Sequence, residues 1–351
     1  MINLKNSFNG KNIVVTGASG FKGAWLCEIL LLLGANVYGY ALAPEADSLF
    51  EKAKLDTKIH FKEADIRDLE KLTNFVKESN PDYIIHMAAQ PLVIDSYKRP
   101  VYTYEVNVMG TVNILESIKH LYKKVSFLNV TTDKVYENNE TGDAFVEDDK
   151  LNGKDPYANS KSCSELVTSS YKFAFFEDRL ISTARAGNVI GGGDISANRI
   201  IPDCQRAIIS NSVLEIRNPG SIRPYEHVLD PLNAYLMILA SQYEDKKYEG
   251  SYNVAPDLAD CITTKELVEL YKKHYEGNFD YKITAKGEVL EKESTFLRLS
   301  NEKLKKVFGW KPLMNIDTAV KETALFFKDE LSGANVIDLM EKQIKNYISM
   351  S

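Results

Sequence analysis

Five polar residues between positions 125 and 161 have the types and spacing needed for chemistry at an alcohol. The apolar run VSFLNVTT, which ends at Thr132, reads as a strand buried in a parallel sheet. Asp133 and Lys134 follow it directly. Because ligands of open α/β sheets bind at the carboxyl ends of the strands, we expect Thr132, Asp133 and Lys134 at the rim of a site. Asp133 there offers an acid for a departing hydroxyl group.

Tyr157 and Lys161 stand four residues apart in the segment DPYANSKSCSEL. This segment is expected to be a helix that Asp155 caps and whose first turn contains Pro156. Residues with this spacing share one helix face. A nearby ammonium favours the phenolate, so we expect the pKa of the tyrosine to be lowered. Tyr157 would then take a proton from a hydroxyl group near neutral pH.

The composition argues against several classes of protein. The net charge is -6 and the pI is near 5.6, whereas a nucleic-acid surface needs clustered Lys and Arg. The sequence shows no signal peptide, and its apolar stretch over 24–35 is too short to span a bilayer. We therefore expect a cytoplasmic protein that binds neither nucleic acid nor a membrane. The cysteines lack metal-ligand spacing and are interpreted as reduced packing residues, with no metal site: Cys27, Cys163, Cys204 and Cys261.

A glycine-rich turn near the start of the chain has the spacing of a dinucleotide-binding site. The segment KNIVVTGASGFKG reads as a strand that runs into this turn, where Gly17, Gly20 and Gly23 give the pattern GxxGxxG. A helix up to Gly34 and the strand NVYGYA are expected to follow, as in a βαβ unit. The tight turn lets backbone amides and the positive end of the helix approach a pyrophosphate. We therefore predict that a dinucleotide binds here.

The expected adenosine end of this site departs from the common pattern. An acid that binds the ribose normally ends the second strand, but Tyr40 and Ala41 stand there, so Glu45 or Asp47 would have to serve from the loop. No well-placed arginine indicates a 2′-phosphate, so NAD is favoured over NADP. The predicted cofactor contacts are Gly17, Ser19, Gly20, Phe21, Lys22, Gly23, Tyr40, Asp65, Ile66, Ala88, Ala89, Tyr157 and Lys161.

Strands alternate with helices up to about residue 190, which predicts an α/β fold with a doubly wound parallel sheet. Beyond that point the pattern becomes mixed and mostly helical. We expect a cofactor-binding domain over 1–190, with a returning segment near 226–256, and a smaller mixed α/β substrate domain over most of 191–351. One long helix is expected over 102–121. His86 is interpreted as a hydrogen-bonded strand residue rather than a catalytic one.

Several arginines fall near the expected loops between the two regions, where guanidinium groups would suit a diphosphate. The alternative for each arginine taken singly is pairing with a surface carboxylate. These residues are Arg185, Arg199, Arg217 and Arg223.

Nearly the whole chain resembles the extended short-chain dehydrogenases that act on nucleotide sugars. GxxGxxG with YxxxK marks only the superfamily, whereas TDK after the fifth strand, ARAGNVIGGGD and RNPGSIRPYEHVL are more specific. These strings are most similar to the branch that dehydrates CDP-glucose. The resemblance implies a Rossmann-type domain, a bound NAD and a nucleotide-sugar substrate. It also implies homodimers or homotetramers that pack through helices near 101–121 and 157–176.

The resemblance also implies roles for the polar residues. Tyr157 would remove the proton of the carbon-4 hydroxyl while NAD takes hydride from that carbon, with Lys161 on the nicotinamide ribose and Thr132 supporting the hydroxyl. Asp133 would protonate the hydroxyl that leaves carbon 6, and hydride would return to carbon 6. The implied substrate contacts are Gln90, Asn107, Asn188, Arg199, Arg217 and Arg223.

Some alternatives remain open at this point. Many dehydratases of this type carry Glu after the Asp as the base at carbon 5, but this chain has Lys134. That lysine would serve as the base if burial and Lys161 lower its pKa, or it only pairs with Asp133. A dehydratase or 4-epimerase for a dTDP-, UDP- or GDP-linked sugar shares most of these residues. A non-catalytic NAD-binding protein shares the fold alone.

Overall fold

The computed structural model describes residues 3–177, 179–277, 279–284 and 294–350. A parallel sheet in the order β11-β6-β5-β4-β1-β2-β3 forms its centre. From β1, the strands that follow in the chain are added first on one side, as β2 and β3, and then on the other side, from β4 onward. This reversal of strand order confirms the predicted doubly wound arrangement. The strands of this sheet are β1 (Asn12–Thr16), β2 (Asn36–Ala41), β3 (His60–Glu63), β4 (Tyr83–His86), β5 (Ser126–Thr132), β6 (Leu180–Ala186) and β11 (Ser251–Val254).

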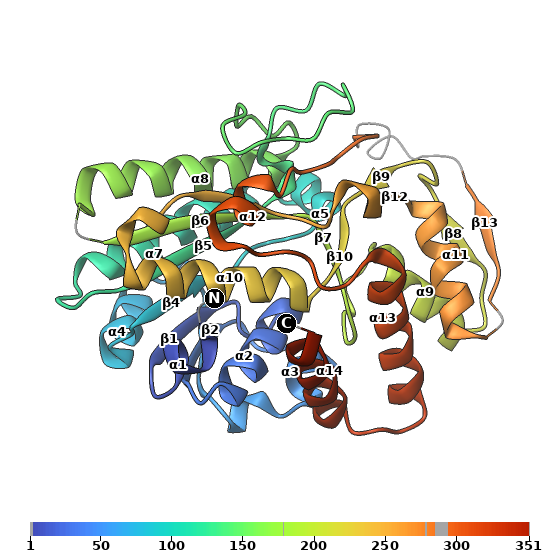
Figure 1. The fold of residues 1–351 in the computed structure, drawn as a ribbon, viewed down its shortest axis with the longest axis horizontal. Helices are drawn as coiled ribbons and strands as arrows, with labels where there is room; N and C mark the ends of the chain where they lie inside the picture. Colours follow the sequence, from blue (N-terminus) through green and yellow to red (C-terminus); the bar gives the residue numbers. More distant parts are fainter. Residues whose placement is uncertain (1–2, 178, 278, 285–293, 351) are drawn as a thin grey trace.

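Helices cover both faces of the sheet because successive strand residues face opposite sides. Ile13 and Val15 of β1 pack into one apolar cluster together with α2 and α10, whereas Val14 between them packs into another with α4 and α7. Figure 1 shows α8 and α7 on one side of the strands and α10 on the other. The helices around the sheet are α1 (Leu4–Phe8), α2 (Phe21–Leu32), α3 (Leu49–Lys52), α4 (Leu69–Ser79), α5 (Val93–Lys98), α6 (Pro100–Tyr104), α7 (Gly110–Lys119), α8 (Pro156–Phe175), α10 (Leu229–Glu244) and α14 (Val336–Met350).

A smaller group of helices and short strands lies beside the carboxyl ends of this sheet (Figure 1). Its small sheets each pair two strands: β10 with β7, β12 with β9, and β13 with β8. The elements outside the main sheet are β7 (Asn188–Ile190), α9 (Ile200–Ile209), β8 (Leu214–Ile216), β9 (Ile222–Arg223), β10 (Tyr225–His227), β12 (Ile262–Thr263), α11 (Thr264–Tyr275), β13 (Tyr281–Ile283), α12 (Glu302–Phe308) and α13 (Ile316–Leu331).

The helix expected over 102–121 is not continuous. It comprises α6, a π-helical segment (Glu105–Met109) and α7. A π-helical turn is wider than an α-helical one and is common at functional sites. The turn lies where Asn107 bonds to its neighbours, so local packing rather than periodicity decides the backbone there.

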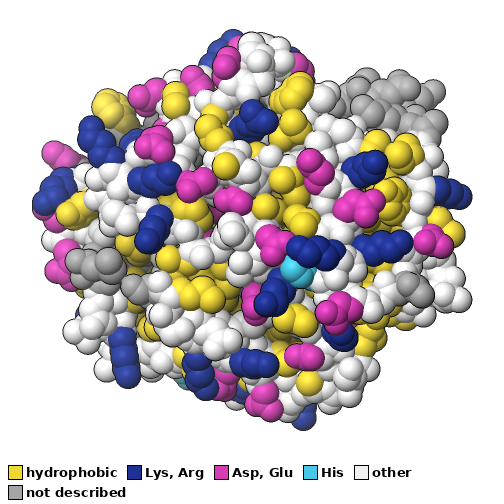
Figure 2. All heavy atoms as spheres, turned by 45° about the vertical axis from the view of Figure 1, so that its right-hand side comes forward, with side chains coloured by type: hydrophobic (Ala, Val, Ile, Leu, Met, Phe, Trp, Pro, Cys, Tyr) yellow, Lys and Arg dark blue, Asp and Glu magenta, His cyan; other side chains and the backbone are white. Residues whose placement is uncertain are grey.

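The surface turned toward the viewer in Figure 2 carries lysines and arginines interspersed with aspartates and glutamates. Within the described residues, no helix combines the length and the apolar character needed to cross a membrane.

Candidate active site

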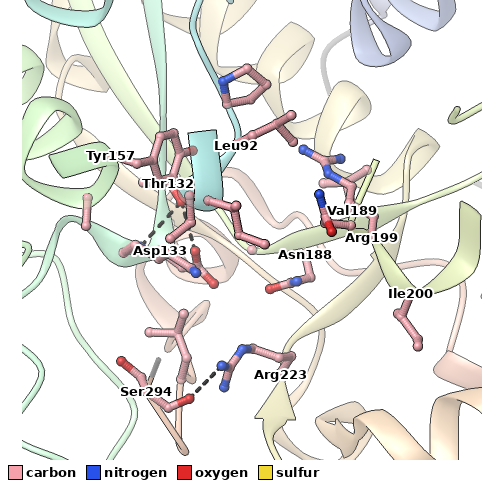
Figure 3. A pocket seen from close by; sticks show the side chains of 18 of the residues that line it. Leu92, Thr132, Asp133, Tyr157, Asn188, Val189, Arg199, Ile200, Arg223 and Ser294 are labelled. Atoms are coloured by element: carbon pink, nitrogen blue, oxygen red, sulfur yellow. Dashed lines mark hydrogen bonds between the residues drawn. The ribbon is translucent and has the colours of Figure 1, made fainter. Parts of the chain in front are cut away.

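A cleft of about 990 Å³ opens where the carboxyl ends of β5 and β6 face the smaller group of elements. Tyr157 and Asp133 lie on its sheet side, and Asn188 and Arg223 lie opposite (Figure 3). The position agrees with the rule that ligands bind at the carboxyl edge of such sheets. The cleft brings together the following predicted site residues: Lys22, Ala89, Thr132, Asp133, Lys134, Tyr157, Lys161, Asn188, Arg199, Arg217 and Arg223.

The helix that carries the tyrosine and the lysine begins as expected. The Asp155 side chain accepts a hydrogen bond of 2.8 Å from the amide of Ala158, and Pro156 occupies the first turn. The Lys161 ammonium donates to the carbonyl oxygen of Val130 at 3.2 Å. This bond ties the buried lysine to the end of β5, and Tyr157 stands one turn earlier beside Thr132.

The expected lowering of the tyrosine pKa is wrong for the protein by itself. Burial raises the pKa of Tyr157 to about 12, although a hydrogen bond with Thr132 and the charge of Arg199 act in the opposite direction. Burial and the nearby charge of Lys22 lower the pKa of Lys161 to about 7. The lysine is therefore only partly charged at neutral pH, and the loss of water around the phenol outweighs the cations around it.

Asp133 has the environment of a proton donor. The side chain is 2% exposed, and the hydroxyl of Thr132 donates to one carboxyl oxygen at 2.9 Å. The other oxygen has no hydrogen-bond partner among the residues that the structure describes. Burial raises the pKa of this carboxyl, against the charges of Lys134 and Arg223. A carboxyl of this kind retains its proton at higher pH than an exposed one and can donate it to a substrate.

The glycine-rich turn fits a dinucleotide pyrophosphate. Gly17 has a φ of +74°, and a Cβ added there would lie 2.8 Å from the amide nitrogen of Ala88. A Cβ at Gly23 would lie 2.2 Å from the carbonyl oxygen of Gly17. Gly20 precedes α2 and has no side chain to cap the helix, so the first amides of α2 are left for another acceptor.

These contacts predict different effects of substitution at Gly23 and at Gly20. We expect Gly23→Ala to lower the free energy of unfolding by about 3 kcal/mol, because the added methyl group meets rigid backbone. Gly20→Ala should leave the stability nearly unchanged, since its nearest atom would be at 3.4 Å, but should weaken dinucleotide binding. Urea unfolding and dinucleotide titration of both variants test this pair. Equal losses of stability would contradict it.

The expected adenosine end is built from buried and paired side chains. Tyr40 is fully buried, and its hydroxyl donates to the carbonyl of Asp65 at 3.1 Å, so it supports the Asp65 loop. The Asp65 carboxylate pairs with Arg67 at 2.8 Å, and Arg67 also pairs with Glu105 at 2.7 Å. Both acids and Arg67 line a second hollow of about 430 Å³. The Ser19 hydroxyl donates to the carbonyl of Leu42 at 3.0 Å, which joins the turn to the end of β2.

Two residues predicted to touch the substrate lie outside the cleft lining. The amide of Gln90 donates to the side-chain oxygen of Asn107 at 2.8 Å, and the Asn107 side-chain nitrogen donates to the hydroxyl of Ser160 at 2.9 Å. Both side chains are buried. This network holds α8 against the loop after β4. It therefore supports the position of Tyr157 on α8. His86 is likewise buried and bonded to Thr16 at 2.8 Å, as expected for a structural histidine.

The four candidate arginines do not share one environment. Arg185 is buried in an ion pair with Glu165 at 3.0 Å and lies outside the cleft lining. Arg199 lines the cleft and pairs with Asp194 at 3.4 Å. Arg217 also lines the cleft, and its guanidinium donates to the side-chain oxygen of Asn198 at 3.2 Å. Arg223 is buried at the cleft wall, where it donates to the carbonyl of Ser294 at 2.6 Å (Figure 3).

Comparison with known proteins identifies the family of this chain. Residues 14–323 match the family model described as GDP-mannose 4,6 dehydratase. The chain belongs to this dehydratase family. It is 38% identical over 354 residues to CDP-glucose 4,6-dehydratase of Salmonella typhimurium, with 98% of each chain covered. It is 23% identical to CDP-paratose 2-epimerase of Salmonella typhi over 88% of this chain and 97% of that protein.

Solved structures of related enzymes have the same fold as this dehydratase family member. The dTDP-glucose 4,6-dehydratase of Bacillus anthracis in complex with NAD has a TM-score of 0.78 at 21% identity, covering 93% of this chain and 100% of that one. The UDP-glucose 4-epimerase of Thermus thermophilus, also with NAD, has a TM-score of 0.78 at 24% identity, with coverages of 90% and 98%.

The dehydratase cleft also contains residues that the sequence analysis missed. Tyr225 lines the cleft together with Arg223, two positions earlier, whereas the next residue along the strand, Glu226, lies outside the lining. Alternation along an extended strand was the available signal for Tyr225. Glu226 carried no signal, because only the packing of other elements around it shows that it is buried.

Proposed function

We propose that this dehydratase uses NAD to convert CDP-D-glucose to CDP-4-dehydro-6-deoxy-D-glucose. The reaction oxidises carbon 4, eliminates water across carbons 5 and 6, and returns the hydride to carbon 6. The observation that carries the proposal is the presence of Tyr157 and the buried Asp133 carboxyl in one cleft. The 38% identity to a CDP-glucose 4,6-dehydratase over 98% of both chains supports the choice of substrate.

In the first step the protein removes the proton of the hydroxyl group at carbon 4. When bound, NAD would supply the chemistry of accepting and returning a hydride. We assign the hydroxyl proton to Tyr157, whose phenolate is favoured by the hydrogen bond with Thr132 and by the charge of Arg199, although burial outweighs both in the protein by itself. We assign Lys161, held at the end of β5, to the nicotinamide ribose. The glycine-rich turn and the uncapped start of α2 fit the pyrophosphate.

In the second step the residues after β5 remove water. Oxidation at carbon 4 acidifies the proton at carbon 5, and we assign its removal to Lys134, which lines the cleft. Asp133 donates its proton to the hydroxyl leaving carbon 6, since burial raises the pKa of its carboxyl. The alternative for Lys134 is that its charge only lowers the pKa of Asp133, an effect that it does have.

The substrate diphosphate is assigned to Asn188, Arg199, Arg217 and Arg223, which all line the cleft. Asn188 and Arg223 lie across the cleft from Tyr157 and Asp133 (Figure 3). A 4-epimerase for another nucleotide sugar is the main alternative. An epimerase needs no acid at carbon 6. The dehydratase is therefore favoured by Asp133, one of whose oxygens has no hydrogen-bond partner in the part of the chain that the structure describes. A non-catalytic NAD-binding protein is disfavoured because Thr132, Asp133 and Tyr157 converge in one place.

The purified protein incubated separately with CDP-, dTDP-, UDP- and GDP-glucose tests the proposal. We expect a 4-keto-6-deoxy product from CDP-glucose, and a hydrogen label at carbon 4 should reappear at carbon 6. Turnover of another nucleotide sugar in preference to CDP-glucose would show that this other sugar is the substrate. Loss of the label to solvent would refute internal return of the hydride. Absence of a 4-keto product from all four compounds would refute the dehydratase assignment.

We also propose that two copies of the chain associate through the outer face of α8 and the adjoining helix. Phe173 of α8 is 94% exposed, and Leu166 on the same face is also exposed. Val101 and Met109 add exposed apolar surface on the neighbouring helical segments. Exposed apolar side chains that gather on one face are typical of protein interfaces.

Phe173→Glu is expected to shift the protein from dimer or tetramer toward monomer, because it places a charge in the apolar contact. Sedimentation velocity measures the change. The matched control is Ile209→Glu, which alters another exposed apolar residue, on α9. A wild-type chain that sediments as a monomer, or a Phe173→Glu variant that assembles normally, would rule out this interface.

A further inference from the structure

An ion pair buried beside the cleft joins β6 to α8. Arg185 of β6 and Glu165 of α8 (the buried pair) are each 3% exposed, and neither lines the cleft. The guanidinium of Arg185 donates a hydrogen bond of 3.0 Å to each carboxylate oxygen of Glu165. The hydroxyls of Thr131 and Thr183 donate to the same two oxygens. Because bidentate bonds between a guanidinium and a carboxylate are specific in direction, the pair is held in one geometry.

The same guanidinium also reaches the loop that follows β5. Its remaining terminal nitrogen donates to the hydroxyl of Tyr136 and to the carbonyl oxygen of Glu147, both at 2.8 Å. The Tyr136 hydroxyl in turn donates to the side-chain oxygen of Asn253 at 2.6 Å. The Tyr136 ring stacks on that of Phe145, with the ring centroids 4.8 Å apart. Tyr136 is thus fixed at both its hydroxyl and its ring.

These contacts anchor both ends of the segment that carries the proposed acid. The 3-10 turn Asp133–Val135 lies between Thr131 and Tyr136 in the chain. Thr131 is bonded to the carboxylate of the buried pair, and Tyr136 is bonded to its guanidinium. A shift of the buried pair would therefore move the turn from which Asp133 and Lys134 project.

The residues assigned to the oxidation step are held by other contacts. Asp155 caps the first turn of α8, which carries Tyr157. The ammonium of Lys161 donates to the carbonyl oxygen of Val130. None of these bonds is made to the buried pair. Loosening the link between the buried pair and Tyr136 should therefore disturb the turn after β5 more than it disturbs Tyr157 and Lys161.

We propose that Arg185 and Glu165 are positioning residues that hold the turn bearing Asp133 and Lys134 in place for the elimination of water. A buried ion pair is often no more stabilising than apolar side chains of similar volume, so the bonds that this pair directs explain it better than stability does. A proton donor must lie within about 2.6–3.2 Å of the atom that it protonates. The inference rests on the proposed function, because it concerns the second step of that reaction.

Tyr136→Phe tests the link at its weakest point. The substitution removes the hydroxyl that accepts from Arg185 and leaves the ring stacked on Phe145. We expect elimination to slow about tenfold, as for a small misplacement of a reacting group, while oxidation at carbon 4 keeps its rate. Rapid mixing with CDP-glucose should then show reduced nicotinamide that accumulates and decays about tenfold more slowly than in the wild type.

Arg185→Lys separates positioning from charge. The lysine keeps the positive charge beside Glu165, but its ammonium lacks the planar fork that bonds both carboxylate oxygens and the Tyr136 hydroxyl together. We expect reduced nicotinamide to accumulate in this variant at least as strongly as in Tyr136→Phe. If the arginine only neutralised Glu165, lysine would restore wild-type kinetics.

Amide hydrogen exchange gives a readout that needs no nucleotide sugar. Peptides that cover residues 132–136 should exchange faster in Tyr136→Phe and Arg185→Lys than in the wild type, because the turn opens more often. The matched control is Tyr252→Phe. Tyr252 is equally buried on β11 and lies outside the cleft lining, and its hydroxyl donates to the carbonyl oxygen of Tyr248 at 2.6 Å. This control should match the wild type in exchange over 132–136 and in the decay of reduced nicotinamide.

The inference is overturned if reduced nicotinamide does not accumulate in Tyr136→Phe, or if Arg185→Lys has wild-type kinetics. Equal accumulation in Tyr252→Phe would also overturn it, because any lost buried hydrogen bond would then have the same effect. If Arg185→Lys does not fold, the comparison of Tyr136→Phe with Tyr252→Phe decides. A wild type that converts no nucleotide sugar overturns the proposed reaction. The exchange measurement then decides whether the buried pair orders the turn, and unchanged exchange in Tyr136→Phe would refute that role.

Discussion

Tyr157→Phe is expected to lower kcat by about 10³-fold while the fold and dinucleotide binding persist. The substitution removes only the hydroxyl to which we assign the substrate proton, and the ring continues to fill its place in the cleft wall. The loss should be large because Lys161 is one turn away and is already bonded to the carbonyl of Val130, so it cannot simply replace the phenol. Steady-state rates and the near-ultraviolet absorbance of reduced nicotinamide measure the effect.

Tyr104→Phe is the matched control for this change. The Tyr104 hydroxyl donates to Asn159 at 2.9 Å, outside the cleft lining. Its removal should cost about 1 kcal/mol of stability and leave kcat close to the wild-type value. A similar loss in both variants would mean that α8 had moved, rather than that a proton acceptor had been removed. A Tyr157→Phe enzyme with nearly normal kcat would show that another group takes the carbon-4 proton.

Asp133→Asn is expected to separate oxidation from elimination. The amide retains the oxygen that accepts from Thr132 but has no acidic proton for the leaving hydroxyl. We expect product formation to fall about 10²–10³-fold while oxidation at carbon 4 still occurs. Mixing this variant with substrate should therefore produce a lasting increase in reduced nicotinamide, which the wild type shows only transiently.

Lys134→Met provides the contrast to Asp133→Asn. If Lys134 removes the carbon-5 proton, this variant should also oxidise carbon 4 but should not exchange the carbon-5 hydrogen with solvent. Asp133→Asn should still allow that exchange. Loss of oxidation itself in Asp133→Asn would contradict the role of Asp133 as a donor confined to the elimination step. Exchange in Lys134→Met at the wild-type rate would assign the base to another group.

The sequence determined those features that depend on a few neighbouring residues. The Gly17 turn, the Asp155 cap and the spacing of Tyr157 and Lys161 are local, since backbone sterics, one capping bond and the helical repeat decide them. The apolar run ending at Thr132 likewise determined the strand and the edge at which it ends. Together these features placed the candidate site residues at the carboxyl rim of a doubly wound sheet.

Only the tertiary structure decided how those side chains behave. The pKa of Tyr157 rises because segments distant in the sequence exclude water from it, which the Tyr157–Lys161 spacing does not reveal. Asn107 is held in a buried hydrogen-bond network because Gln90 and Ser160 meet it in space. Glu226 is isolated from solvent by the elements packed around β10, not by its own strand. Burial and charge are sums over all surrounding elements, so the complete fold sets the chemistry that the local motifs position.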